Sequence, residues 1–274
     1  MNNKLKVGIV GCGAIGTSLA REIAGPLSAQ AQLTALFDID LRKSSRMQKL
    51  IIPGKRLCVS SLAELVKKSR LVIEASAAKS SYLIAKTALK SGCSVMLMSV
   101  GGVAGHIKEL ASLARKNNAF VYIPSGAISG VDALKAAAIS KISSVTLITR
   151  KHPLSFKGVE FVAKQRINLD KLKKDRILFS GSAMQAVKLF PQNINVAAVL
   201  SIAGLGTKKT KVKIIASPTV KKNIHEISII SRAANITTRT ENILHPDNPK
   251  TSYLAVLSAI ATLRQILVPV RIGT

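Results

Sequence analysis

The glycine-rich run at residues 11–16, with the sequence GCGAIG, has the spacing that brings a backbone close to a pyrophosphate. Gly11 permits a tight turn, Gly13 leaves room for the phosphates, and Gly16 lets a helix pack closely on a strand. The spacing alone is a weak signal, but an apolar strand pattern at 4–10 precedes it and a helical pattern follows it. The first N–H groups of such a helix favour an anion. The dinucleotide contacts predicted here are Gly11, Gly13, Ala14, Ile15 and Gly16.

An acidic residue, Asp38, ends the next apolar strand pattern, roughly 20 residues beyond the glycines. A carboxylate at this place accepts hydrogen bonds from the adenosine ribose hydroxyls of a dinucleotide. Asp38 therefore favours NAD over NADP, because a carboxylate repels the additional phosphate of NADP. Arg42 and Lys43 lie just beyond it and could weaken this preference. The alternative, an ordinary turn residue at a strand end, is the weaker interpretation beside the glycines.

Two histidines are candidates for proton transfer, because an imidazole titrates near working pH. His225 lies in a strand pattern at 223–230, where neither face is clearly polar. The residues alone therefore favour a structural role for His225. His245 precedes a proline where a strand pattern ends, and the favoured interpretation is a solvent-facing turn residue.

The first half of the chain supplies a scaffold that can position the glycine loop. Nearly continuous apolar strand patterns alternate with helical patterns, which predicts a parallel sheet covered on both faces, of the doubly wound Rossmann type. Ligands of such sheets bind at the carboxyl ends of the strands. The predicted strands are 4–10, 33–37, 71–75, 94–100 and 120–123, and the later helices are 82–90, 106–118 and 131–140.

The second half predicts an α+β unit, because several strand patterns arrive in succession near the end. We expect an antiparallel sheet with helices on one face, from strands at 144–149, 176–180, 211–216, 223–230 and 236–240. The predicted organisation is a dinucleotide-binding domain at 1–125 and an α+β catalytic or oligomerisation domain at 126–248. The last helix, 252–267, is expected to pack back on the first domain, which would bring the preceding loop to the cleft between domains.

The formal net charge of +28 is the compositional anomaly of the chain. The lysines are scattered and aromatic residues make up only 3% of the sequence, so nucleic-acid binding is not favoured. We interpret the charge as a solvated surface that could help to attract a dianionic substrate. No apolar stretch is long enough to span a bilayer, and no signal peptide precedes the first strand. Three cysteines without a CxxC pair indicate a reduced, cytoplasmic setting, and no metal site is predicted.

Several motifs together resemble the L-aspartate dehydrogenase family, and the resemblance covers nearly the whole chain. The segments are GCGAIG (11–16), PSGAISGVDA (124–133), TRK (149–151), FPQNINVAA (190–198), NIHEI (223–227) and NPKTSYLA (248–255). The last three of these motifs together are specific, whereas the glycine loop alone would suit many dehydrogenases.

The resemblance implies NAD(P)-dependent oxidation of L-aspartate to iminoaspartate by a homo-oligomer. Iminoaspartate can hydrolyse to oxaloacetate and ammonia, or feed quinolinate formation on the way to NAD. His225 matches the proposed catalytic histidine of the family. Ala127 and Asn195 match positions that contact the cofactor, Ala127 through its backbone; Asn195 could also cap the helix that it begins.

An aspartate substrate presents two carboxylates and needs cations or hydrogen-bond donors. The stiff, proline-containing run at 245–254 suits this purpose, because it leads directly into a helical pattern. Lys250 is the expected cation, and Thr251 and Ser252 would donate hydrogen bonds from the helix start. A capping Thr-Ser pair beside a surface lysine is an equally good interpretation. Arg150 and Lys151, at a strand end, are weaker candidates.

Two alternative functions remain open from the sequence. One is another two-domain dehydrogenase or reductase, acting on homoserine, a semialdehyde or dihydrodipicolinate. The other is a non-catalytic protein that senses nucleotides and uses its basic surface for nucleic acid. The glycines, Asp38 and the 248–255 motif argue against the second alternative.

Overall fold

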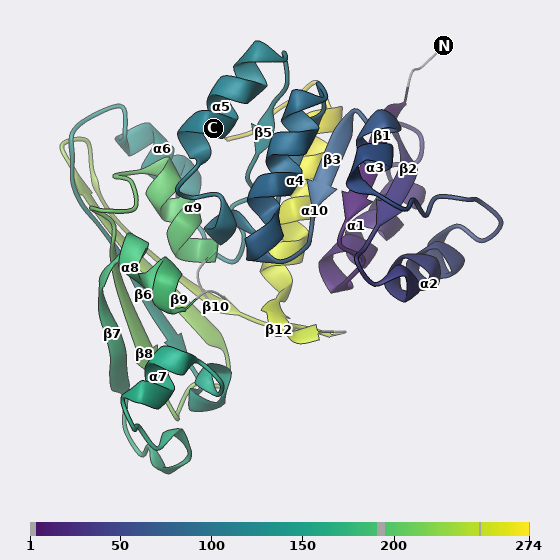
Figure 1. Ribbon diagram of the computed structural model, residues 1–274. Coiled ribbons are helices and arrows are strands. Elements are labelled where there is room, and N and C mark those ends of the chain that lie inside the picture. The colour runs from purple at the N-terminus through teal and green to yellow at the C-terminus, as the bar shows by residue number, and fades with distance from the viewer. Residues whose placement is uncertain (1–3, 191–194, 247, 274) are drawn as a thin grey trace. The chain divides into compact units, whose positions relative to one another are not determined.

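The computed structural model describes residues 4–190, 195–246 and 248–273 (Figure 1). The chain divides into two compact units, each with its own sheet. The first unit contains the residues up to Pro124 together with Val256–Arg271, and the second contains Ser125–Ala255.

The first unit is built on a five-stranded parallel sheet with the strand order β2-β1-β3-β4-β5. The predicted Rossmann-type parallel sheet is therefore confirmed. The chain runs from β1 outward to β2 and then returns to β3 on the other side, so the topological switch point lies between β1 and β3. The strands are β1 (Leu5–Val10), β2 (Ala31–Phe37), β3 (Leu71–Glu74), β4 (Ser94–Leu97) and β5 (Val121–Tyr122).

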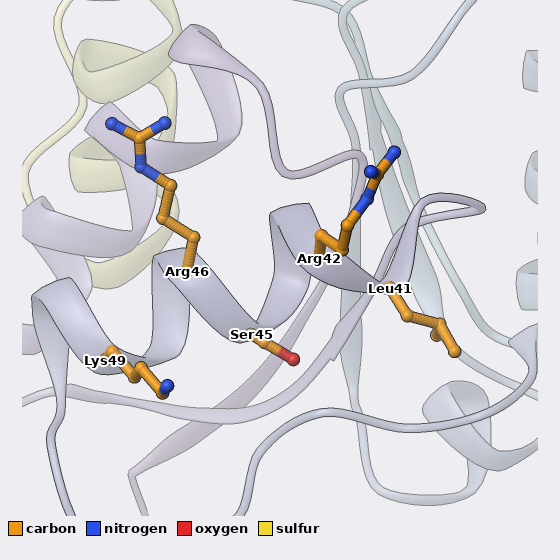
Figure 2. A pocket seen from close by; sticks show the side chains of 5 residues that line it. All are labelled: Leu41, Arg42, Ser45, Arg46 and Lys49. Atoms are coloured by element: carbon orange, nitrogen blue, oxygen red, sulfur yellow. The ribbon is translucent and has the colours of Figure 1, made fainter.

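Helix α2 (Leu41–Ile51) follows the end of β2 and packs on the unit through a narrow side only. Asp40 begins it, since its side chain accepts a hydrogen bond from the backbone N–H of Arg42. Ser44 and Met47 are its buried residues. The exposed side of α2 lines an open hollow of about 480 Å³ (Figure 2), formed by Leu41, Arg42, Ser45, Arg46 and Lys49.

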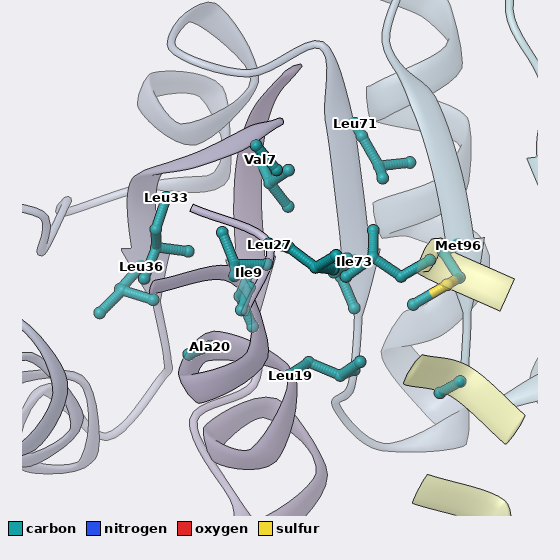
Figure 3. Close-up of a cluster of buried hydrophobic side chains, with 14 of the residues drawn as sticks. Val7, Ile9, Leu19, Ala20, Leu27, Leu33, Leu36, Leu71, Ile73 and Met96 are labelled. Atoms are coloured by element: carbon teal, nitrogen blue, oxygen red, sulfur yellow. The ribbon is translucent and has the colours of Figure 1, made fainter. Parts of the chain in front are cut away.

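One face of the parallel sheet is covered by α1 (Ala14–Ala24) and α10 (Tyr253–Leu267). Leu19 of α1 and Leu263 of α10 are fully buried in one hydrophobic cluster with strand residues such as Ile9 and Ile73 (Figure 3). The other face contacts α3 (Leu62–Lys67) and α4 (Ala78–Lys90). A 3-10 helix at Val100–Gly102 and α5 (Ile107–Lys116) complete the unit. The pattern predicted a longer strand at 94–100, but β4 ends at Leu97 because the chain turns into the 3-10 helix.

The second unit contains a five-stranded sheet with the order β10-β9-β6-β8-β7. The expectation of an antiparallel sheet is wrong for one pair, since β6 and β8 are parallel. The chain between them is long enough to return in the same direction, because it holds β7 and several helical segments. The strands are β6 (Ile142–Lys151), β7 (Arg176–Ser182), β8 (Lys211–Ala216), β9 (Asn223–Ser231) and β10 (Asn235–Asn242).

An aromatic cluster fills the core at the β7 edge of this sheet. Phe190 contacts the rings of Phe156, Phe161 and Phe179 edge-on, with ring centroids 5.5–6.4 Å apart. Phe179 belongs to β7, and the other three come from helical segments or their ends. The remaining elements are α6 (Val131–Ala137), 3-10 helices at Pro153–Phe156 and Leu169–Lys171, α7 (Glu160–Lys164), α8 (Ala183–Leu189), α9 (Asn195–Ala203), β11 (Leu244–His245) and β12 (Asn248–Ser252).

Candidate functional site

The glycine loop lies at the switch point of the parallel sheet, where the ends of β1 and β3 meet. Gly11 has a φ of 95°, and a Cβ atom there would lie 2.4 Å from the carbonyl oxygen of Ala75, which follows β3. A Cβ atom on Gly16 would lie 2.1 Å from the carbonyl oxygen of Gly11. Any larger residue at these two positions would therefore force the turn apart.

Gly13 differs from these two glycines because a Cβ atom there would meet no protein atom within 4 Å. Gly13 precedes α1, whose start has no side-chain cap, and Ala14 and Ile15 are partly exposed. Open space in front of an uncapped helix start suits an anionic group. The residues present therefore fit the pyrophosphate of a dinucleotide.

Asp38 holds the glycine loop from the end of β2. Its Oδ2 accepts the backbone N–H of Cys12 at 2.8 Å, and its Oδ1 accepts the backbone N–H of Asp40 at 2.9 Å. A carboxylate can accept about four hydrogen bonds, so capacity remains for ribose hydroxyls. Cys12 is buried, and burial raises the pKa of its thiol to about 12, with a further contribution from the charge of Asp38. The thiol is therefore inert, in keeping with a packing role.

Glu74 is a member of this site that the sequence analysis missed. It is fully buried at the end of β3. Its Oε1 accepts the N–H and the hydroxyl of Ser76, and its Oε2 accepts the N–H of Ser99 at 2.9 Å. Glu74 thereby joins the loops that follow β3 and β4. A carboxylate at the end of the apolar strand LVIE was the signal that could have revealed it.

His225 lies in β9, between β10 and β6 in the sheet of the second unit, and it is 3% exposed. It pairs across the strands with Thr149 of β6, and His225 Nδ1 lies 3.0 Å from Thr149 Oγ1. Burial lowers the pKa of the imidazole to about 3, and the charge of Lys151 contributes to the same shift. The imidazole is therefore neutral at physiological pH.

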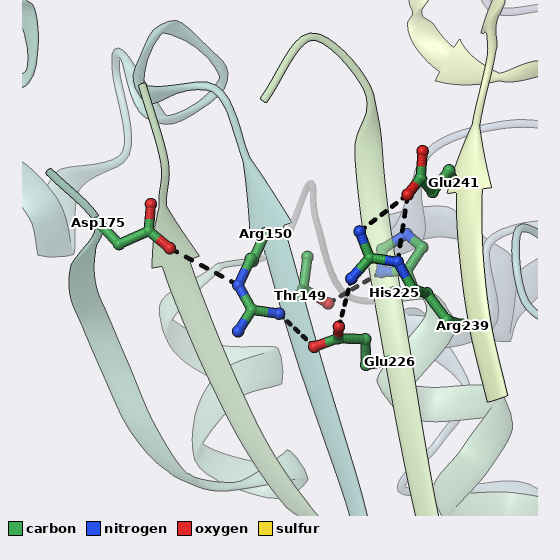
Figure 4. Close-up of polar contacts among 7 residues, drawn as sticks. All are labelled: Thr149, Arg150, Asp175, His225, Glu226, Arg239 and Glu241. Atoms are coloured by element: carbon green, nitrogen blue, oxygen red, sulfur yellow. Dashed lines mark hydrogen bonds and ion pairs between the residues drawn. The ribbon is translucent and has the colours of Figure 1, made fainter. Parts of the chain in front are cut away.

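The opposite face of the same strands carries a chain of ion pairs (Figure 4). Glu226 pairs with Arg150 and with Arg239, and Arg239 also pairs with Glu241. Burial raises the pKa of Glu226, but the two guanidinium groups together outweigh this effect and hold the pKa below its ordinary value. Arg150, a weaker substrate candidate, is thus engaged with Glu226 and Asp175.

Ala127 and Asn195, the cofactor positions that the resemblance implies, occupy different settings. Ala127 is buried, and its carbonyl accepts a hydrogen bond of 3.0 Å from the Asn242 side chain. Asn195 is exposed as the first residue of α9. The residue before it lies outside the described part of the chain, and both cofactor roles stay predictions.

Within the described part of the run at 245–254, β11 pairs with β12 and α10 follows, and this corrects two expectations. Thr251 and Ser252 lie in β12, not at the helix start, and Thr251 Oγ1 accepts a hydrogen bond of 3.1 Å from Asn248. His245 is 4% exposed rather than solvent-facing, because strand pairing in β11 places it edge-on against Tyr253. Lys250 also lies in β12, but its side chain is outside the described residues.

The described ranges hold neither a metal-binding cluster nor a membrane-spanning helix. Within them, no three His, Cys, Asp or Glu side chains come together as a metal site. No helix of these ranges is both long enough and apolar enough to cross a membrane. Cys12, Cys58 and Cys93 are free thiols.

The chain matches a curated L-aspartate dehydrogenase along its whole length. The relative from Methanosarcina mazei is 45% identical over 273 residues, which cover 98% of this chain and 100% of the relative. The chain belongs to the L-aspartate dehydrogenase family. The predicted family resemblance is therefore confirmed. Residues 132–266 also match the family model of the aspartate dehydrogenase C-terminal region.

Solved structures of this family and of more distant dehydrogenases agree with this assignment. Aspartate dehydrogenase from Thermotoga maritima superposes with a TM-score of 0.72 at 26% identity, covering 99% of this chain and 100% of that one. Residues 11–124 match the NAD-binding domain of homoserine dehydrogenase. A homoserine dehydrogenase from Thiobacillus denitrificans is only 12% identical, with a TM-score of 0.61, and shares the fold alone.

Proposed function

We propose that the protein oxidises L-aspartate to iminoaspartate and prefers NAD as its cofactor. The observation that carries the proposal is the 45% identity to an L-aspartate dehydrogenase over the full length of both chains. Iminoaspartate would then hydrolyse to oxaloacetate and ammonia, or supply quinolinate formation.

The first unit would hold the dinucleotide. The nicotinamide, when bound, supplies the acceptor for the hydride that leaves the substrate Cα. The space beside Gly13 and the start of α1 receive the pyrophosphate, with Gly11 and Gly16 keeping the turn tight. Asp38 would accept the ribose hydroxyls, and the family resemblance adds the Ala127 backbone and the Asn195 side chain, which belong to the second unit.

His225 would manage the proton of the reaction. The substrate amine must lose a proton before hydride can leave its Cα, and the imidazole can accept it when the negative charge of the bound substrate raises the imidazole pKa from about 3. Thr149 occupies Nδ1, which assigns Nε2 to the substrate amine or to a water that attacks the imine carbon. Lys250, Thr251 and Ser252 remain candidates for holding carboxylates.

A turnover assay tests the proposed reaction. The purified protein should reduce NAD when given L-aspartate, and should oxidise NADH when given oxaloacetate and ammonia. Homoserine, aspartate semialdehyde and dihydrodipicolinate serve as competing substrates in the same assay. NAD binding without turnover of L-aspartate in either direction would overturn the assignment, and salt-sensitive retention of nucleic acid would then favour a nucleotide sensor.

The preference for NAD is tested by Asp38→Asn. Removing the charge should raise KM for NAD and lower KM for NADP, by roughly tenfold each, because the repulsion of the additional phosphate disappears. Asp40→Asn is the matched control, since Asp40 faces solvent and contacts Arg42 instead of the glycine loop. If the ratio of the KM values for NAD and NADP is the same in Asp38→Asn as in the wild type, Asp38 does not select the cofactor.

We also propose that the protein is a homo-oligomer, as the family resemblance implies. Light scattering during gel filtration measures the mass directly. A mass near the 29.1 kDa of one chain would contradict the proposal.

A further inference from the structure

One face of the mixed sheet is apolar along most of its length and polar at one end. We call it the inner face, because its side chains form the buried side of β6 and β9. Two successive rows across β6, β9 and β10 are largely apolar: Val145, Ile229 and Ile236, then Leu147, Ile227 and Thr238. The next row is Thr149, His225 and Thr240. The composition of the inner face thus changes abruptly at His225.

Lys151 extends this polar end along β6. It follows Thr149 by two residues in the same strand, so its side chain projects from the same inner face. Thr149 lies opposite His225 and Arg150 opposite Ile224, so Lys151 belongs to the row of the inner face next to His225. Its charge contributes to the low pKa of His225. Burial also lowers the pKa of Lys151 itself to about 8. The residue as a whole is partly exposed.

The acidic residue of the adjacent strand does not share this face. Glu226 is on the opposite side of β9, where Arg150 and Arg239 hold its two oxygens. The motif TRK thus sends Thr149 and Lys151 to the inner face and Arg150 to the ion pairs. Glu226 therefore does not pair with Lys151, because the two side chains lie on opposite faces of the sheet.

Asn242 is a second, independent sign that this end of the sheet receives a ligand. It pairs with Asn223 in the row beyond His225, and it is 1% exposed. Its Nδ2 donates to the Ala127 carbonyl, whereas its Oδ1 is buried and has no hydrogen-bond partner among the described residues. A buried acceptor without a donor destabilises the folded protein, and a donor on a ligand would offset this cost.

We propose that this polar end of the inner face binds the amino-acid substrate and that Lys151 is the cation that receives one of its carboxylates. The inference rests on the proposed function. Lys151 would pair with the carboxylate where little water competes, which strengthens the interaction. It would also place the substrate amine beside the neutral imidazole of His225.

Lys151→Met removes the charge and keeps much of the side-chain volume, and Lys151→Arg restores a cation. The matched control is Lys213→Met, because Lys213 lies in β8 opposite Ile148, on the other face of the same sheet. Each protein is assayed for kcat, for KM of L-aspartate and NAD, and for inhibition by succinate, a dicarboxylate without an amine. NMR titration of the His225 imidazole, with NAD present, gives a readout that does not depend on turnover.

Lys151→Met should raise KM for L-aspartate and the inhibition constant of succinate by roughly ten- to hundredfold, as expected for losing a charged hydrogen bond. KM for NAD should not change, Lys151→Arg should recover part of the loss, and Lys213→Met should behave as wild type. Succinate should raise the pKa of His225 in the wild type, because its charge offsets that of Lys151. In Lys151→Met this pKa should already be higher without succinate.

An unchanged inhibition constant of succinate in Lys151→Met would overturn the proposal. A loss of kcat alone would also overturn it, because Lys151 would then transfer a proton and not hold a carboxylate. Should Lys151→Met fail to fold, the wild type is titrated with saturating succinate instead. An unchanged pKa of His225 in that titration would overturn the proposal. A wild type that binds succinate in this way but does not oxidise L-aspartate contradicts the proposed function and leaves the Lys151 site standing.

Discussion

The two sheets of this protein place their chemistry differently. The parallel sheet offers its candidate site beyond the ends of its strands, where Gly11, Gly13 and Gly16 shape a backbone turn. The mixed sheet offers its candidate site on a face, where side chains of neighbouring strands meet, as Thr149 and His225 do. The first site depends on glycines, which lack a side chain and so leave room for the turn and the ligand. The second site depends on strand register. A single local motif can therefore specify the first site but not the second.

The largest effect should come from the face of the mixed sheet. His225→Ala should lower kcat by roughly 10²- to 10⁴-fold, the usual contribution of a general acid or base, with little change in NAD affinity. Steady-state kinetics and calorimetric titration with NAD measure the two quantities. His152→Ala is the control, because His152 is exposed in the same unit. Full activity of His225→Ala would remove this residue from the mechanism and weaken the contrast between the two sheets.

Two glycines of the turn in the parallel sheet should differ in what they support, Gly16 the stability of the fold and Gly13 the binding of NAD. Gly16→Ala should destabilise the protein by more than about 2 kcal/mol, because its Cβ would meet the Gly11 carbonyl at 2.1 Å. Gly13→Ala should unfold at nearly the wild-type temperature but bind NAD much more weakly, since the new methyl group enters the space meant for phosphate. Thermal unfolding with and without NAD distinguishes the two variants. Equal NAD affinity of Gly13→Ala and wild type would place the pyrophosphate elsewhere.

Glu74→Gln should show that the turn also depends on a buried carboxylate. The amide group of glutamine would face an N–H that now donates to Glu74, so we expect a loss of about 2 kcal/mol in the free energy of unfolding. Urea denaturation measures it. Glu109→Gln, at an exposed carboxylate, should change the stability far less. Wild-type stability of Glu74→Gln would mean that the Ser76 and Ser99 loops hold their positions without it.

His225 should also make the protein sensitive to acid. Its pKa is about 3 in the folded protein, compared with the ordinary value of 6.5, so the unfolded chain binds the proton first. The free energy of unfolding therefore falls as the pH drops below 6.5, by about 1.5 kcal/mol on reaching pH 5. Unfolding at both pH values should show this loss in the wild type, and a smaller loss in His225→Gln. Equal losses in the two proteins would show that His225 titrates normally when folded.

The features that the sequence predicted well are local ones. The glycine loop, the strand before it and Asp38 at the end of the next strand lie where the pattern puts them, because turn and helix geometry follow from neighbouring residues. Glu74 was missed for the opposite reason. Its partners are the loops after two strands, and only the parallel pairing of β3 and β4 brings Ser99 to its carboxylate.

The expectations that failed depended on contacts between segments. His245 was expected in solvent, but the pairing of β11 with β12 buries it beside Tyr253. Thr251 and Ser252 were expected at a helix start, but the same pairing makes them part of a strand. A short polar run with two prolines does not reveal whether a hairpin will form, because cross-strand pairing decides it.

The sequence by itself determined the parallel-sheet unit, the glycine turn and the family, since these follow from short-range periodicity and from specific motifs. Only the tertiary structure decided which face of β9 is the inner one. The isoleucines on both sides of that strand leave the alternation ambiguous, and the pairing of β6 with β9 resolves it. That register buries His225 against Thr149, sends Glu226 to the ion pairs, and places Lys151 on the inner face. Side-chain chemistry on a sheet thus follows from register, which is a property of two strands and not of one.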